Sequence, residues 1–189
     1  MLPIADLRHY VKTYDGALDH DFCTRMIESF HAMERFHTPN GRGYRDGLEQ
    51  SAWTELDITP LADEDFKRLF LGQILAYLGR YNGELGLTIP VPPSPHISEL
   101  VIKRYRPGRA EHFQPHFDSI GTVANRYLVF LWYLNDVAKG GETAFVDLGV
   151  EVRPAAGRLL MFPPYWMFQH EGRPPLSGDK YILSTYLLF

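Results

Sequence analysis

Cysteine is nearly missing from this sequence of 189 residues, which contains only Cys23. A single thiol cannot form a disulfide within the chain, so a disulfide-stapled scaffold is excluded and a reducing compartment is favoured. Because Cys23 lies in a segment with helical periodicity, a buried structural thiol is a better interpretation than a nucleophile. No stretch approaches the roughly 18 apolar residues of a membrane span, and no basic start with an apolar run opens the chain. We therefore expect a cytoplasmic protein without a membrane partner.

The chain also lacks an excess of basic residues, with 19 Lys and Arg against 23 Asp and Glu. The formal net charge is -4 and the sequence pI is about 6.0. No dense basic face is indicated, which disfavours nucleic acid as a partner. Hydrophobic residues make up 45% and aromatic residues 14% of the sequence, which suits a β-rich core or an aromatic-lined pocket. At this length we expect one domain over residues 1–189.

Two amphipathic helices are predicted in residues 1–95, together with an N-terminal strand. The first helix runs from Asp19, as N-cap, to Phe36, and the second from Thr59, as N-cap, to Tyr81. The segment Thr38–Gln50 between them is rich in glycine and charge, which is typical of a surface loop or a substrate lid. Alternation over residues 51–57 then predicts an edge strand.

Short strands are predicted throughout residues 96–189, after the proline-rich stretch IPVPPSPH. Their number and spacing indicate a β-sandwich or barrel that forms the core. Arg126–Asn135 is apolar on both faces, which is typical of a central strand covered on each side. The predicted strands are Ile97–Tyr105, Phe113–Asp118, Arg126–Leu134, Glu142–Phe145, Arg158–Phe162, Met167–His170 and Lys180–Leu187.

The stretch HFQPHFDSIG, residues 112–121, carries two pairs of residues that suit a metal ion. His112 and His116 have the spacing of a zinc-protease helix, but Pro115 lies between them and no glutamate follows His112. His116 and Asp118 are two apart, so in a strand both side chains project from one face. His-x-Asp alone also occurs by chance, which leaves a purely structural role open.

His170 is the candidate third ligand, because it lies on a predicted late strand that a rolled sheet can bring beside the first pair. Taken alone, it fits a satisfied structural histidine equally well. If His116, Asp118 and His170 converge, they form the facial triad of non-haem Fe(II) oxygenases, with open positions opposite the protein ligands. A closed structural zinc site would need a fourth ligand.

Four ordered blocks carry a family resemblance beyond these three residues. They are Tyr105 before the metal strand, RYLVFLWYLNDVAKGGETAF, PAAGRLLMFP and HEGRPPLSGDKYILSTY. With them, Glu99–Phe189 resembles the catalytic domain of Fe(II)- and 2-oxoglutarate-dependent dioxygenases of the prolyl 4-hydroxylase type. The resemblance implies an α+β, mainly β fold, with a double-stranded β-helix (jelly-roll) core over residues 96–189 and the N-terminal helices packed outside.

The same resemblance implies an activity and a set of site residues. His116, Asp118 and His170 would hold Fe(II), and Lys180, ten residues after His170, would pair with the distal carboxylate of 2-oxoglutarate. Tyr105 would help to bind that carboxylate. The reaction implied is hydroxylation of a C–H bond in a prolyl or other amino-acid residue, with O2 as co-substrate and ascorbate as supporting reductant. The carboxylate at Asp118 favours hydroxylation over halogenation.

Tyr186 stands where prolyl-hydroxylating relatives carry tryptophan, and no separate peptide-binding domain is indicated, which together disfavour prolyl substrates. Tyr105 precedes His116 by a longer interval than is usual in the family, which weakens the assignment of Tyr105 to the 2-oxoglutarate carboxylate. The acceptor is therefore left open as a small molecule, a peptide or a protein. A non-catalytic metal-binding jelly-roll sensor and a nucleic-acid dealkylating dioxygenase are the alternatives. The acidic balance of the chain disfavours the second of these.

Overall fold

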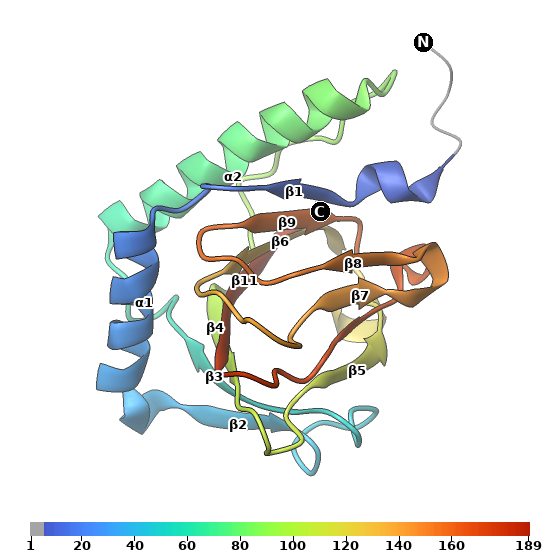
Figure 1. The fold of residues 1–189 in the computed structure, drawn as a ribbon. Coiled ribbons are helices and arrows are strands. Elements are labelled where there is room, and N and C mark those ends of the chain that lie inside the picture. The colour runs from blue at the N-terminus through green and yellow to red at the C-terminus, as the bar shows by residue number, and fades with distance from the viewer. Residues whose placement is uncertain (1–5) are drawn as a thin grey trace.

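Two antiparallel sheets face each other in the computed structural model, which describes residues 6–189 (Figure 1). The larger sheet runs in the order β1 (Lys12–Tyr14), β9 (Leu159–Phe162), β6 (Arg126–Tyr133), β11 (Lys180–Leu188), β4 (Val101–Tyr105), β3 (Ala52–Asp57) and β2 (Thr38–Gly41). The smaller sheet runs β5 (Phe113–His116), β10 (His170–Gly172), β7 (Thr143–Phe145) and β8 (Val150–Val152). This is the double-stranded β-helix, so the predicted fold class is confirmed.

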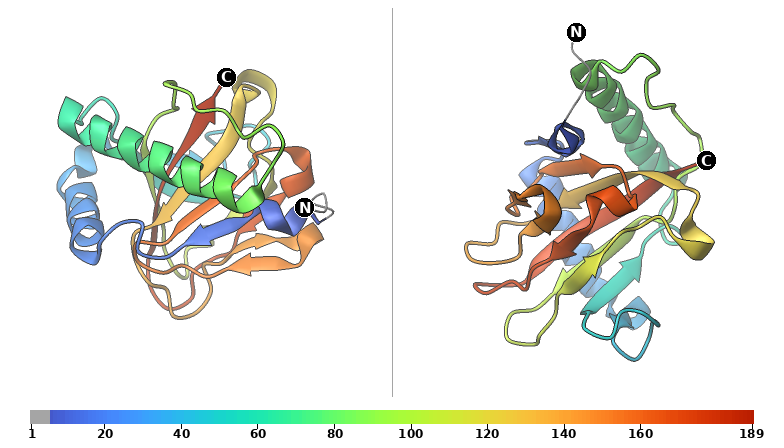
Figure 2. Two further views of the ribbon diagram at one scale, coloured as in Figure 1. Left: turned by 90° about the horizontal axis from the view of Figure 1, so that it is seen from above. Right: turned by 90° about the vertical axis from the view of Figure 1, so that its right-hand side faces the viewer.

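Both α-helices pack on the outer face of the larger sheet (Figure 2). They are α1 (His20–Ala32) and α2 (Glu64–Leu85). None of the described helices is long and apolar enough to cross a membrane. Short 3-10 helices join the strands at η1 (Leu7–Tyr10), η2 (Glu34–Phe36), η3 (Gly121–Val123), η4 (Val146–Leu148) and η5 (Trp166–Phe168).

The start of α1 agrees with its predicted N-cap, whereas the start of α2 does not. The Asp19 carboxylate accepts the Phe22 N–H at 2.6 Å. For α2 the N-cap is Asp63, not Thr59. The Asp63 carboxylate accepts the Phe66 N–H at 2.8 Å, whereas the Thr59 hydroxyl accepts the N–H of Leu100, the residue before β4, at 2.8 Å. Thr59 is thus engaged by a residue distant in the sequence, which no local pattern reports.

Three strand predictions need correction. Strand β3 is not an edge strand, because β2 pairs with it and itself forms the edge. Pro39 fits there, since a residue without an N–H is tolerated at a sheet edge. The segment predicted as the strand Met167–His170 begins as η5, and β10 starts at His170. The segment Thr38–Gln50, predicted as a loop, begins with strand β2, which has four residues, too few for a clear alternation.

Strand β6 is central, as its apolar pattern predicts. It pairs with β9 and β11, and its side chains alternate between two hydrophobic clusters. Phe130 and Trp132 face the helices, where Trp132 makes an edge contact with Phe70 at 5.4 Å between ring centroids. Val129 and Leu131 face the interior between the sheets and reach the pocket described below. One strand thus supports both the helical layer and the floor of the site.

The tight turn before β9 packs closely against the segment that precedes α1, and a substitution at Gly157 tests this contact. Gly157 has φ +77°, and a Cβ there would lie 2.1 Å from the carbonyl oxygen of Leu18. We expect Gly157→Ala to lower the free energy of unfolding by about 3 kcal/mol, from strain and overpacking together. Urea denaturation measures this, with Gly149→Ala as control, because φ is +63° there but no atom lies within 4 Å. An equal loss of unfolding free energy in Gly157→Ala and Gly149→Ala would contradict the close contact between Gly157 and Leu18.

Candidate metal centre and its pocket

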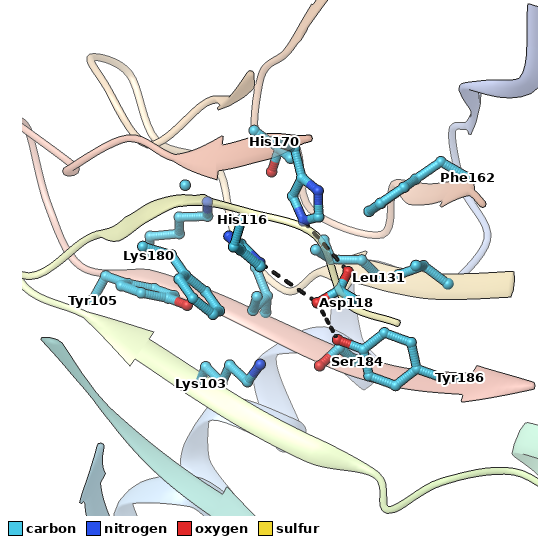
Figure 3. Close-up of a pocket in the computed structure, with 15 residues that line it drawn as sticks. Lys103, Tyr105, His116, Asp118, Leu131, Phe162, His170, Lys180, Ser184 and Tyr186 are labelled. Atoms are coloured by element: carbon cyan, nitrogen blue, oxygen red, sulfur yellow. Dashed lines mark hydrogen bonds and ion pairs between the residues drawn. The ribbon is translucent and has the colours of Figure 1, made fainter. Parts of the chain in front are cut away.

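Three of the residues selected from the sequence meet at one point between the sheets. His116 ends β5, His170 begins β10, and the two residues are direct partners in the sheet register. Asp118 lies just past the end of β5, where its N–H donates to the carbonyl of Pro164 at 2.9 Å. Its carboxylate oxygens lie 3.5 Å from Nε2 of His116 and 3.5 Å from Nε2 of His170 (Figure 3). One ligand atom from each residue lies within 4.8 Å of the other two.

Both imidazole rings are oriented by backbone carbonyl groups. Nδ1 of His116 lies 2.8 Å from the carbonyl oxygen of Gln114, and Nδ1 of His170 lies 3.0 Å from that of Phe168. A carbonyl only accepts, so each Nδ1 carries the proton and each Nε2 lone pair is directed toward the Asp118 carboxylate. Metal-binding histidines are held in this way by partners of their second nitrogen.

Aromatic rings also pack against the same two imidazoles. Phe113 stacks on His116 with ring centroids 3.6 Å apart and an interplanar angle of 9°. Phe162 makes an edge contact with His170 at 4.7 Å, and Phe145 lies 5.4 Å from it. These contacts limit rotation of the imidazoles and keep water away from one side of the cluster.

Burial and mutual proximity set the charge of the cluster. Burial lowers the pKa of His170 to about 4, with a further contribution from His116, so the imidazole is neutral at neutral pH. Burial alone would raise the pKa of Asp118, but the neighbouring His170 and His116 outweigh it and hold that pKa well below its usual range. An ionised carboxylate beside a neutral imidazole is the protonation state that metal binding requires.

Tyr186 contacts the cluster directly. Its hydroxyl donates to Oδ1 of Asp118 at 3.0 Å, and the Arg126 guanidinium carbon lies 3.9 Å from the centre of its ring. Burial and the adjacent carboxylate raise the pKa of Tyr186 well above its ordinary value, so the hydroxyl remains a donor. The sequence marked this position only as a departure from the family pattern. The structure gives it a hydrogen bond to the Asp118 carboxylate.

An inner pocket continues from the cluster to Lys180 and Tyr105, which are direct partners across β11 and β4. Lys180 is only 2% exposed, and its Nζ lies 5.5 and 5.6 Å from the ring centres of Tyr105 and Tyr133. No carboxylate of residues 6–189 lies within 4 Å of this ammonium group. Burial therefore lowers the pKa of Lys180 to about 7. Thr143 also lines the pocket and accepts the Tyr133 hydroxyl at 2.7 Å.

A wider groove opens from the cluster to the surface, along the segment Thr38–Gln50. This segment is tied to β5 through Gln114, whose Oε1 accepts the Gln50 N–H at 2.9 Å and whose Nε2 donates to the Gly47 carbonyl at 2.9 Å. His112 stays outside the cluster, and its Nδ1 lies 3.1 Å from the carbonyl of Ala110. The excluded zinc-protease pairing is therefore absent from the described part of the chain.

Three residues of this region were missed in the sequence. Lys103 and Ser184 line both the inner pocket and the outer groove, and Arg126 lines the groove. Alternation along β4 contains a signal for Lys103, because it stands two residues before Tyr105 and so shares its face. Ser184 and Arg126 carry no such signal, since their positions depend on how β11 and β6 pair.

Comparisons with known proteins agree with this arrangement. A model of the 2OG-Fe(II) oxygenase superfamily matches residues 100–188. A probable prolyl 4-hydroxylase 11 from Arabidopsis thaliana is 36% identical over 105 residues, which cover 50% of this chain and 35% of that protein. The chain thus spans about a third of that relative's length.

Solved structures with the same fold cover almost the whole chain. A prolyl-4-hydroxylase from Pseudomonas putida has a TM-score of 0.69 at 18% identity and covers 95% of this chain and 92% of its own. The Trichoplax adhaerens prolyl hydroxylase, solved with a hypoxia inducible factor peptide fragment, has a TM-score of 0.73 at 17% identity. It covers 95% of this chain and 84% of its own.

Proposed function

We propose that this chain is an Fe(II)- and 2-oxoglutarate-dependent hydroxylase of the 2OG-Fe(II) oxygenase superfamily, because the model of that superfamily matches residues 100–188 and a probable prolyl 4-hydroxylase is 36% identical over 105 residues. The convergence of His116, Asp118 and His170, with ligand atoms within 4.8 Å of one another, carries the proposal. We propose residues 1–189 as one catalytic domain. In support, β1 and β3 from the first half share a sheet with β6 and β11 from the second.

The donor set fits Fe(II). Two neutral imidazoles and one carboxylate occupy one side of an ion and leave the other side open for small molecules. When bound, the metal supplies the oxidising chemistry, in which 2-oxoglutarate and O2 give succinate and CO2 while a substrate C–H becomes C–OH. The residues of the chain then have three tasks. They hold the ligand atoms in place, bind the two organic molecules, and exclude water.

The inner pocket suits a dicarboxylate. Lys180 offers a buried ammonium group without a carboxylate partner in the described chain, and the Tyr105 hydroxyl lines the same pocket. A buried anion needs both a countercharge and hydrogen-bond donors, which these two side chains provide for the distal carboxylate of 2-oxoglutarate. Thr143 lies beside them and adds a hydroxyl. The 2-oxoacid end would then face the metal ligands.

The outer groove is the proposed place of the acceptor substrate. It reaches His116 and Asp118 from the surface and is bordered by the segment Thr38–Gln50, which comprises β2 and the loop after it and which we propose as a substrate-binding lid. The relatives named above are prolyl hydroxylases, and one of them was solved with a peptide fragment. We therefore propose a prolyl or other amino-acid group, in a peptide, a protein or a small molecule, as the acceptor.

The test of the function is a metal-dependent assay. Purified protein is given Fe(II), ascorbate and 2-oxoglutarate under O2, and succinate is measured alongside the visible absorption band of 2-oxoglutarate chelated to Fe(II). Succinate formation that requires Fe(II) is expected. A chelation band without succinate for any candidate acceptor would favour the sensor module. Tight zinc without either signal would reject an oxygenase.

The Tyr186 hydroxyl gives a prediction about the metal ligand. Tyr186→Phe removes the donor to Asp118 but keeps the ring on which Arg126 stacks. We expect the dissociation constant for Fe(II) to rise about tenfold, because outer-shell partners orient a metal-bound carboxylate. Titration with Fe(II) measures the change without turnover. Tyr127→Phe is the control, since that hydroxyl donates to Pro92 at 2.7 Å on the covered side of the sheet. Equal affinity in Tyr186→Phe and the parent would contradict this role.

A further inference from the structure

Lys103 stands where the inner pocket meets the outer groove. It lies on β4 two residues before Tyr105, and its side chain lines both spaces. Its Nζ lies 5.6 Å from the ring centre of Trp53 and 5.7 Å from that of Phe113. In Figure 3, Lys103 and Lys180 approach the cluster from separate places, with Tyr105 near Lys180. The pocket system therefore holds a second ammonium group, on the side from which an acceptor would enter.

The cross-strand carboxylate of Glu55 forms no close ion pair with Lys103. Glu55 is its direct partner in the register of β3 and β4. The two oxygens of Glu55 are taken up elsewhere, because Oε1 accepts from Asn40 at 2.8 Å and Oε2 accepts from Trp53 at 2.6 Å. Among residues 6–189, no carboxylate oxygen comes within 4 Å of Lys103 Nζ. Burial lowers the pKa of Lys103, while the negative charges of Glu55 and Asp118 act in the opposite direction.

Arg126 is a second cation of the groove. Its guanidinium group is held over the Tyr186 ring and reaches the carbonyl oxygen of Asp118 at 3.4 Å. It too has no carboxylate within 4 Å in the described chain. The Ser184 hydroxyl, on a residue 4% exposed, lines the same space. Two cations and a hydroxyl therefore border the acceptor side of the metal ligands.

The groove also contains carboxylates. Its lining includes the acids Asp46, Glu55, Asp57, Glu99 and Asp118 and the cations Arg45, Lys103 and Arg126. An anionic group that reaches the metal ligands therefore passes side chains of both signs, and Lys103 and Arg126 are the cations closest to Tyr186 and Asp118 on this path.

We propose that the acceptor substrate carries a carboxylate, which pairs with Lys103 and Arg126 while the adjacent carbon faces the metal ligands. This inference rests on the proposed oxygenase function and narrows its substrate. The anionic group comes either from a free amino acid or from an acidic residue of a peptide, since both present the same chemistry. The distal carboxylate of 2-oxoglutarate remains with Lys180, in the inner pocket.

Matched acids and amides test the proposal on protein loaded with Fe(II) and 2-oxoglutarate. One arm compares free amino acids with their primary amides. The other compares end-capped peptides that contain Asp or Glu with the same peptides containing Asn or Gln. The measurement is the rate of succinate formation above the rate without any acceptor. Binding of 2-oxoglutarate and its uncoupled turnover are measured first, without the panel, so a failure of the proposed function is seen separately.

We expect at least one acid to stimulate succinate formation about tenfold more than its amide, because the acid pairs with the partly buried Lys103 and Arg126, whereas the amide leaves both cations without a partner. Lys103→Met should remove this preference, and its effect on the dissociation constant of 2-oxoglutarate should be clearly smaller than its effect on acceptor stimulation, because Lys103 lines the inner pocket but does not replace Lys180 there. Lys139→Met, which removes an exposed lysine elsewhere, should keep the preference. The arm that responds identifies the source of the carboxylate.

Three results would overturn the inference. One is a panel in which no acid is preferred over its amide. Another is a preference that survives in Lys103→Met. The third is a loss of 2-oxoglutarate affinity in Lys103→Met as large as the loss of acceptor stimulation, which would assign Lys103 to the co-substrate instead.

Discussion

Asp118→Ala is expected to abolish succinate formation. It should also weaken Fe(II) binding by more than about 100-fold, which is the largest loss usually seen when a residue outside the set of direct metal ligands is removed. Asp118 supplies the only carboxylate of the three-residue cluster identified in residues 6–189. Its oxygens lie 3.5 Å from Nε2 of both His116 and His170, so its removal leaves two neutral nitrogens to hold a divalent ion. Fe(II) titration and a succinate assay measure the two effects separately.

His112→Ala is the matched control for that experiment. His112 lies near the same strand but bonds to Ala110 outside the cluster, so its loss should leave Fe(II) affinity unchanged. Circular dichroism checks that Asp118→Ala still folds. A folded Asp118→Ala protein that retains the parent's Fe(II) affinity would remove this carboxylate from the proposed metal site.

The position of the site was within reach of sequence reasoning because its parts follow simple periodicities. His116 and Asp118 are close in the chain, and the apolar run of β6 marks the centre of the larger sheet. His170 was harder to place, since its link to His116 is a register between β5 and β10 that no local pattern encodes. In the sequence, only the resemblance to the dioxygenase family joined His170 to His116. In the structure, the two imidazole rings lie 4.3 Å apart between centroids.

The predictions that were wrong, and the residues that were missed, depend on contacts between segments distant in the sequence. Thr59 resembles an N-cap by its residue type, but its hydroxyl binds Leu100, and Asp63 caps α2 instead. In the sequence, Lys103 is a single charged residue within a predicted strand. Its proposed role depends on the hydrogen bonds that Glu55 accepts from Asn40 and Trp53. Those bonds come from the pairing of β2 with β3, which the sequence predicted as a loop and an edge strand. Propensity rules cannot report which partner a polar group chooses.

Lys180→Ala is expected to raise the dissociation constant of 2-oxoglutarate by about 100-fold, in the range found when one partner of a buried charge pair is removed. Lys180 is 2% exposed, and its direct register partner across the sheet is Tyr105. The variant would leave the distal carboxylate buried without a countercharge. Isothermal titration of 2-oxoglutarate into the metal-loaded protein measures the change, with Lys139→Ala as the exposed control. An unchanged constant would exclude Lys180 from the co-substrate site.

The same lysine predicts how 2-oxoglutarate affinity depends on pH. Burial lowers the pKa of free Lys180 to about 7; Glu142 opposes the shift and Lys103 adds to it. A bound carboxylate stabilises the ammonium form, so the pKa is higher in the complex. Below pH 7 the lysine is protonated in both states and affinity is flat. Above pH 7 binding must take up a proton, and the dissociation constant rises by about tenfold per pH unit. Lys180→Ala removes this slope, and a slope that persists in the variant would assign the titration to another group.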